Sequence, residues 1–195
     1  MKRMVATSIG TLLVAAMSAL FLASVPAASA GGACTITGTA SDDQLNGTAG
    51  RDVICGLGGN DRIRGRGGND VIRGGAGRDR IDGNLGPDIL VGGGGRDLID
   101  GGQGNDRING GALRDRILGA RGEDNIRGGS GRDRLVGGPN DDRIKGGQQN
   151  DRLRGNYGDD TLDSRDGSGG DLVEGMQGAD TCASDPGDTV SGCEA

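Results

Sequence analysis

Apolar and polar positions recur with a fixed period of nine residues over most of this chain. Counting in nines from Gly38 to Gly155, each of fourteen successive units begins with glycine. The sixth place of every unit is aspartate, the eighth is Leu or Ile, and the fourth is usually glycine. Such a period over residues 38–163 indicates one small structural unit that is repeated and stacked.

Each unit predicts a turn followed by a short strand. Glycines at the first, second and fourth places allow the backbone angles of a tight turn over the first six residues. The last three residues, such as Leu98 to Asp100 in GGGGRDLID (92–100), predict a strand. Side chains alternate along a strand, so only the eighth-place aliphatic residue points inward and forms the core. One aliphatic side chain per nine residues is a small core, which indicates that something else stabilises the fold.

The sixth-place aspartates suggest what that is. With two units per coil they form two columns, in which neighbours lie eighteen residues apart in sequence and ~5 Å apart in space. Carboxylates at that spacing repel each other unless they are protonated or share a cation. Ca²⁺ accepts six or more oxygens, whereas Mg²⁺ demands a stricter octahedron. The candidate metal ligands are Asp43, Asp61, Asp79, Asp97, Asp115, Asp133 and Asp151 in one column, and Asp52, Asp70, Asp88, Asp106, Asp124, Asp142 and Asp160 in the other.

Units such as GGGGRDLID (92–100) and GGSGRDRLV (128–136) match every specified place of the motif G-G-x-G-x-D-x-U-x, where U is aliphatic. The chain therefore resembles the repeat-in-toxin (RTX), or hemolysin-type, calcium-binding nonapeptide family over residues 38–163. The resemblance implies an all-β fold, a parallel β-roll (β-solenoid) with two repeats per coil and two short parallel sheets. It also implies that the glycine–aspartate turns bind several Ca²⁺ ions and that the chain folds when calcium binds.

Some units depart from the motif. Leu113 and Gln149 replace the fourth-place glycine, where a bulky side chain is expected to strain the turn, and Asn140 is the milder replacement. Arginine stands at the fifth place in several units, where RTX copies often carry Asn: Arg51, Arg78, Arg96, Arg114 and Arg132.

The N-terminal segment predicts export. Residues 1–30 have a short basic head, an apolar stretch and a small-residue ending, which is typical of a secretory signal peptide cleaved after Ala30. An uncleaved anchor helix is the alternative. The chain has 22 Lys and Arg against 28 Asp and Glu. Loss of Lys2 and Arg3 leaves 20 against 28, a net charge of −8. We expect a secreted, extracellular, acidic protein with no membrane insertion of the mature chain.

The four cysteines of an exported chain predict disulfides. Cys34 and Cys55 flank the first unit, whereas Cys182 and Cys193 lie in the tail. Seven coils at about 4.8 Å separate the two groups by roughly 34 Å, and a disulfide requires Cα atoms within about 7 Å. The predicted pairs are Cys34–Cys55 and Cys182–Cys193, and free or metal-binding thiols are the alternative.

The ends of the array differ from its middle. Residues 31–37 are expected to form an N-terminal cap, in which CTIT (34–37) supplies a first strand. Ser164 and Arg165 interrupt the count, which resumes as DGSGGDLVE (166–174) and GMQGADTCA (175–183). Residues 164–195 are therefore predicted to be degenerate repeats that form a disulfide-linked C-terminal cap, because repeat arrays need atypical ends.

Composition argues against two other classes of function. The chain has no His, no zinc-protease motif and no G-x-S-x-G elbow, and a carboxylate pattern repeated fourteen times is a ladder rather than a catalytic pair. We therefore predict that it is not an enzyme. Arginine–glycine tracts resemble RNA-binding segments, but export, abundant aspartate and 1% aromatic residues argue against nucleic acid.

One further pattern supports an alternative function. The seventh place of one column carries a nearly continuous row of outward arginines, which we call the arginine row: Arg62, Arg80, Arg116, Arg134 and Arg152. A solvated face is one interpretation. The other is a calcium-dependent, adhesin-like module that binds an anionic cell-surface or extracellular polysaccharide.

Overall fold

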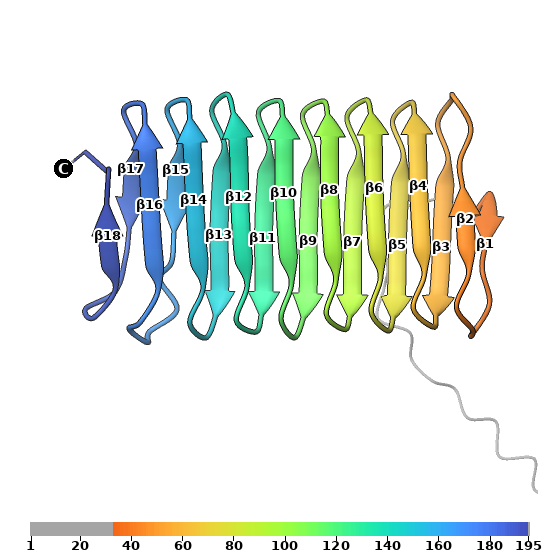
Figure 1. Cartoon of the computed structure of the whole chain (residues 1–195), viewed down its shortest axis with the longest axis horizontal. Coiled ribbons are helices and arrows are strands. Elements are labelled where there is room, and N and C mark those ends of the chain that lie inside the picture. The colour runs from red at the N-terminus through yellow and green to blue at the C-terminus, as the bar shows by residue number, and fades with distance from the viewer. Residues whose placement is uncertain (1–32, 195) are drawn as a thin grey trace, which may run out of the picture. The chain divides into compact units, whose positions relative to one another are not determined.

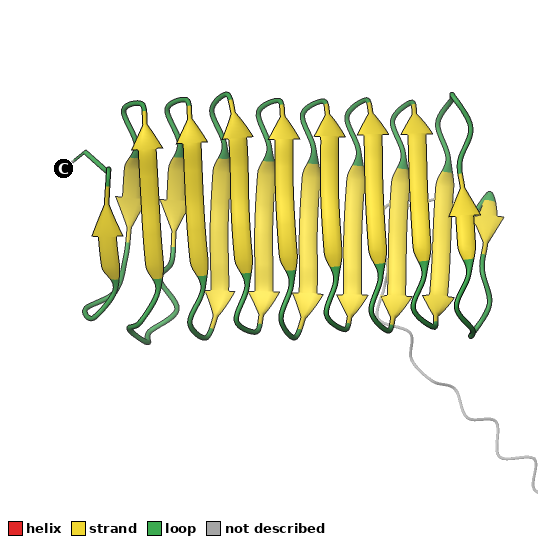
Figure 2. Ribbon diagram, in the orientation of Figure 1, coloured by secondary structure: helices red, strands yellow, loops and turns green. Residues whose placement is uncertain are grey.

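The structure is a computed structural model that describes residues 33–194. The predicted signal peptide (1–30) lies outside the described residues. Within 33–194 the regular elements are strands, and none is a helix that could cross a membrane. The strands stack into two parallel sheets that face each other, one in front of the other in Figure 1, and they run in opposite directions in the two sheets. Turns connect the sheets at both edges (Figure 2).

Consecutive strands alternate between the sheets, and each sheet contains nine strands. The odd-numbered sheet comprises β1 (Ile36–Thr37), β3 (Val53–Gly58), β5 (Val71–Ala76), β7 (Ile89–Gly94), β9 (Arg107–Ala112), β11 (Asn125–Ser130), β13 (Arg143–Gln148), β15 (Thr161–Asp163) and β17 (Thr181–Ala183). The even-numbered sheet comprises β2 (Gln44–Asn46), β4 (Arg62–Gly67), β6 (Arg80–Leu85), β8 (Leu98–Gln103), β10 (Arg116–Arg121), β12 (Arg134–Pro139), β14 (Arg152–Tyr157), β16 (Leu172–Gln177) and β18 (Thr189–Ser191).

The register confirms two repeats per coil. Ile117 in β10 lies beside Ile99 in β8 on one side and beside Leu135 in β12 on the other. Each partner is eighteen residues away, so identical places of alternate repeats stack on one another along the roll. The predicted all-β parallel β-roll is therefore confirmed.

The strands are longer than the sequence predicted. A full strand such as β8 has six residues, and it continues from the seventh to ninth places of one unit into the first three of the next. Only the fourth to sixth places form the turn. The prediction of three-residue strands was wrong because positive φ angles at the second place, such as +106° at Gly102, are accommodated within the paired strand. Gly102 stays in register with Ala120 of the next strand.

The core is a double column of eighth-place aliphatic side chains. These side chains form one continuous buried cluster, and Ile36 and Leu45 pack against its N-terminal end. The buried members are Ile54, Ile63, Ile72, Ile81, Leu90, Ile99, Ile108, Ile117, Ile126, Leu135, Ile144, Leu153, Leu162 and Val173. The eighth place was correctly predicted to be the core.

Each end of the roll carries one disulfide. Residues Ile36–Thr37 of CTIT form β1, which pairs with β3. The Cys34–Cys55 disulfide joins this end, with Cα atoms 6.0 Å apart, and the Cys182–Cys193 disulfide joins the other, with Cα atoms 5.8 Å apart. Both predicted pairs are confirmed, and they account for all four cysteines of the sequence.

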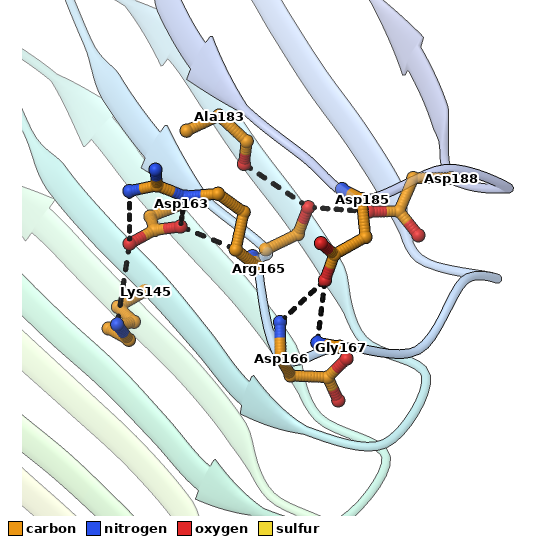
Figure 3. Close-up of polar contacts among 9 residues, drawn as sticks. Lys145, Asp163, Arg165, Asp166, Gly167, Ala183, Asp185 and Asp188 are labelled. Atoms are coloured by element: carbon orange, nitrogen blue, oxygen red, sulfur yellow. Dashed lines mark hydrogen bonds and ion pairs between the residues drawn. The ribbon is translucent and has the colours of Figure 1, made fainter.

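The two-residue insertion at Ser164 and Arg165 is absorbed in a turn. Arg152 in β14 lies beside Leu172 in β16, twenty residues away, and the eighth-place Leu153 still lies beside Val173. Around this turn, Asp163 accepts hydrogen bonds from Arg165 and Lys145, and Asp185 accepts bonds from the main-chain N–H groups of Asp166 and Gly167 (Figure 3). The core therefore continues in register through the insertion.

Candidate metal centre

The sixth-place aspartates point into the roll rather than into solvent. They stand where each turn passes into a strand, between an exposed fifth-place residue and a seventh-place residue that is exposed in most units but buried at Val53 and Val71. Twelve of the fourteen, Asp61 to Asp160, are at most 2% exposed. Asp52 is 7% exposed and Asp43 is half-buried. The predicted columns therefore exist, as two buried ladders of carboxylates inside the two edges of the roll.

From Asp61 onward, one oxygen of each ladder carboxylate accepts a hydrogen bond from the main chain of the preceding coil. The N–H of Asp97 donates to Oδ1 of Asp115, and the N–H of Asp106 donates to Oδ1 of Asp124, each at 2.8 Å. The same bond recurs from Asp43 to Asp61 and onward along both columns. It fixes each carboxylate in one orientation, with Oδ2 directed away from that donor.

The second oxygen has no hydrogen-bond partner in the interior of the ladders. A buried anionic oxygen without a donor is strongly destabilising, because burial removes its hydration and nothing replaces it. The unpartnered oxygens are Oδ2 of Asp61, Asp70, Asp79, Asp88, Asp97, Asp106, Asp115, Asp124, Asp133, Asp142, Asp151, Asp160 and Asp180. These regularly repeated orphan acceptors indicate a positively charged ligand.

First-place glycines leave the space beside these oxygens. A Cβ atom on Gly92 would lie within 3.0 Å of both Oδ2 of Asp97 and the main-chain oxygen of Gly110. The same two neighbours, a ladder carboxylate and the first-place carbonyl one coil further, surround Gly56 and Gly101. A carboxylate and a carbonyl oxygen therefore border one small space, and both are the oxygen ligands that Ca²⁺ takes in proteins.

Burial raises the pKa of the ladder carboxyls from Asp61 to Asp160, because the charged form is poorly solvated there. The hydrogen bond from the preceding aspartate N–H lowers the pKa, and neighbouring carboxylates raise it. The resulting values are about 8 for Asp142 and Asp151, about 7 for Asp88, Asp106 and Asp115, and about 6 for Asp97, Asp124 and Asp160.

This shift predicts that the metal-free roll is more stable in acid. The pKa values of Asp142 and Asp151 lie above the ordinary 3.8, so the metal-free folded state binds more protons than the unfolded state. The stabilisation that these extra bound protons give to the folded state is therefore fully present below pH ~4, and it is lost as the pH rises towards about 8. We expect protein stripped of divalent ions to gain β-sheet circular dichroism when the pH falls from about 8 to about 5. A metal-free β signal that grows as the pH rises would contradict this.

The first two ladder aspartates differ from the rest. Oδ2 of Asp43 accepts the N–H and the hydroxyl of Thr39 at 2.6 and 2.9 Å. Oδ2 of Asp52 accepts the same two groups of Thr48 at 2.6 and 2.9 Å. These two carboxylates are brought into the ladders as predicted, but their second oxygens already have donors.

Aspartates beyond Asp160 also belong to the ladders, although they were not among the predicted ligands. Asp171 and Asp180 are buried, and they accept the N–H groups of Asp151 and Asp160. Each occupies the sixth place of a degenerate unit, so the resumed count after Arg165 was a sufficient signal. The array of candidate ligands therefore extends into the region predicted to be a cap.

A family model for the RTX calcium-binding nonapeptide repeat matches residues 35–63, 56–90, 82–117, 110–144, 136–168 and 165–190. The chain belongs to this family. The resemblance inferred from the motif is therefore confirmed, and the match also includes the degenerate units. No curated protein matches the chain.

The ladder fits the calcium ion that the family name implies. Within residues 33–194, no group of three or more Asp, Glu, His or Cys side chains converges as a ready-made metal cluster. The carboxylates come one per turn, and the first-place carbonyl beside each orphan Oδ2 provides a further oxygen. A cation at these turns would therefore take main-chain as well as side-chain ligands, which suits calcium.

The arginine row lies in one line on the outer face of the even-numbered sheet. The register places Arg62 beside Arg80, and Arg134 between Arg116 and Arg152, and Leu98 interrupts the row. All five arginines are exposed. Sequence reasoning did not include Arg114 and Arg132, whose fifth-place side chains lie at the adjoining edge. These two join Arg116, Arg134 and Arg152 in lining a groove of about 700 Å³.

Proposed function

We propose that this protein is a secreted, non-catalytic module that binds several calcium ions and folds into its β-roll as they bind. The observation that carries the proposal is the series of buried, unpartnered Oδ2 atoms. An apolar core limited to one aliphatic side chain per repeat gives little stability to offset thirteen such oxygens. Membership of a calcium-binding repeat family and two disulfides support the ion and the oxidising environment.

The ladder carboxylates from Asp61 to Asp160, together with Asp180, would hold the ions, with first-place glycine carbonyls as further ligands. Bound calcium would supply the positive charge that these oxygens lack and would link successive coils. The chain's own contribution is to aim Oδ2 by holding Oδ1 and to keep the first place free of a side chain. Side-chain and main-chain oxygens at fixed positions favour Ca²⁺ over the smaller, more strongly hydrated Mg²⁺.

Calorimetric titration of the purified chain with Ca²⁺ tests this proposal. We expect binding of several ions per chain at roughly 0.1–1 mM, coupled to folding of the roll. Equal concentrations of Mg²⁺ should give much less heat. Absence of calcium binding up to ~10 mM would overturn the proposal.

The groove favours a second candidate function, which is calcium-dependent binding of an anionic polysaccharide as an adhesin-like module. Five arginines line the groove at the spacing of successive coils, together with Asp115, Asp133, Asp151 and Asp171, whose negative charge bound calcium would offset: Arg114, Arg116, Arg132, Arg134 and Arg152. Next to the N-terminal part of the row, the ninth place is occupied by the acidic residues Asp82 and Asp100. Beside the groove it is occupied by the apolar residues Leu118 and Val136, which do not offset the positive charge. A linear polymer with regularly spaced sulfate or carboxylate groups fits such a row by charge.

The second candidate is tested by retention on immobilised dextran sulfate, which, unlike a polyuronate, does not depend on calcium for its own association. Folded protein should be retained in calcium and should elute as salt rises, since exposed charge contacts are screened. Glutamine at the five groove positions, Arg114, Arg116, Arg132, Arg134 and Arg152, should abolish retention and leave the calcium-induced circular dichroism unchanged. A matched control removes five exposed arginines outside the groove: Arg51, Arg107, Arg121, Arg127 and Arg143. Equal loss in both variants would show that net charge alone causes retention.

A further inference from the structure

The turns of the roll fall into two conformational classes, which the second place of each unit distinguishes. From Leu57 to Met176, every second-place residue has a positive φ, between +73° and +155°. Thr39 and Thr48 occupy the same place in the first two units and do not have a positive φ. A β-branched residue is strongly disfavoured at positive φ. Threonine therefore excludes the second-place backbone conformation that all later units adopt.

In the first class, the second-place threonine donates hydrogen bonds to the sixth-place carboxylate of its own unit. Thr48 donates both its N–H and its hydroxyl to Oδ2 of Asp52, and its hydroxyl oxygen accepts the N–H of Gly50 at 3.1 Å. Thr39 makes the corresponding bonds to Asp43 and Ser41. In the second class the second-place residue makes no such bond, and Oδ2 has no hydrogen-bond partner from Asp61 to Asp160 and at Asp180.

At the C-terminal end of one ladder, the last carboxylate also accepts hydrogen bonds from protein donors. The column that begins at Asp43 passes through Asp151 and Asp171 to Asp188. Oδ1 of Asp188 accepts the N–H groups of Gly170 and Asp171 at 2.9 and 3.1 Å, and Oδ2 accepts the N–H of Asp185 and the hydroxyl of Ser164, both at 2.9 Å. Figure 3 shows Asp185 and Asp188 at this end. Protein donors thus replace a cation where the ladder terminates.

We infer that the first coil of the roll is a calcium-independent cap, in which Thr39 and Thr48 provide to Asp43 and Asp52 the positive partner that calcium provides to later carboxylates. The calcium sites then begin at Asp61. This inference rests on the proposed function, and it changes the sequence-based prediction that all fourteen sixth-place aspartates are metal ligands. The Cys34–Cys55 disulfide encloses the same coil, so its closure also needs no metal.

The matched variants are T39G/T48G and T39V/T48V in the full chain. Glycine restores the consensus second place and permits positive φ, so it should create two further orphan oxygens and raise the number of calcium ions bound per chain. Valine removes the hydroxyl but keeps the β-branched restriction and the main-chain N–H. It should leave the number of bound ions unchanged. Bound calcium is counted by equilibrium dialysis with the metal alone as the probe.

A second pair of variants tests the same inference in case the threonine variants fold poorly. Asp52→Asn should leave the calcium number and the calcium midpoint of folding unchanged, whereas Asp97→Asn should lower the number and raise the midpoint several-fold. If Asp52→Asn loses as many ions as Asp97→Asn, or if T39G/T48G binds the same number as the wild type, the inference is wrong while the proposed function stands. If the wild type binds no calcium, the proposed function fails first.

Discussion

Chelation of calcium at neutral pH is expected to convert the roll into a largely disordered chain, and addition of Ca²⁺ at roughly 0.1–1 mM to restore it. The core contributes one aliphatic side chain per repeat, whereas folding orders the glycines of every repeat and buries thirteen unpartnered carboxylate oxygens. Far-ultraviolet circular dichroism follows the change, and the expected gain on calcium addition is nearly the whole β signal.

Magnesium at equal concentration provides the control for this experiment, because it bears the same charge but demands a stricter shell of ligands. It should restore much less of the β signal. A cooperative, β-rich spectrum that persists in chelator at neutral pH would falsify the view that metal binding supplies the missing stability.

The second large effect is expected when one methyl group is added at a first-place glycine. Gly92→Ala places a Cβ within 3.0 Å of Oδ2 of Asp97 and of the Gly110 carbonyl, so it closes the space between two candidate calcium ligands. Overpacking of this kind costs about 1–3 kcal/mol. With the lost ligand geometry added, we expect the affinity of the affected calcium site to fall by roughly tenfold or more, where tenfold corresponds to about 1.4 kcal/mol, and the calcium midpoint of folding to rise.

Gly94→Ala is the matched control, because a Cβ at Gly94, two residues further along β7, meets no atom within 4 Å. Its φ is not positive, so alanine fits the backbone, and restriction of the unfolded chain should make the variant neutral or slightly more stable. Calcium titrations followed by circular dichroism compare the two variants. Similar midpoints would mean that the first-place space is not part of the site.

The periodic features of this protein could be predicted from sequence because each depends on spacing alone. An eighteen-residue separation placed Ile99, Ile117 and Leu135 in one column, and it separated the two pairs of cysteines. The length of the strands was not predictable from the glycine pattern, because Gly102 carries a positive φ and yet remains in a paired strand.

Which carboxylates lack a hydrogen-bond partner also could not be predicted from the sequence. Asp52 and Asp97 occupy the same place of the motif, yet only Asp97 has an unpartnered oxygen. The difference depends on whether a threonine four residues earlier donates to it, and a consensus motif that requires only aspartate at the sixth place does not report that bond. Similarly, Arg114 and Arg132 seemed only departures from the motif until the fold brought them beside the arginine row.

The eighteen-residue register has a consequence for how such a chain can change its length. Removal of one whole coil, for example residues 92–109, would leave every later residue in its own sheet and its own column. Removal of a single nine-residue unit would instead transfer each later strand to the opposite sheet. The core would be preserved, because every unit has an aliphatic eighth place, but Arg116, Arg134 and Arg152 would move to the other face. Gene duplication or deletion in steps of eighteen residues therefore preserves a surface pattern, whereas steps of nine preserve only the fold.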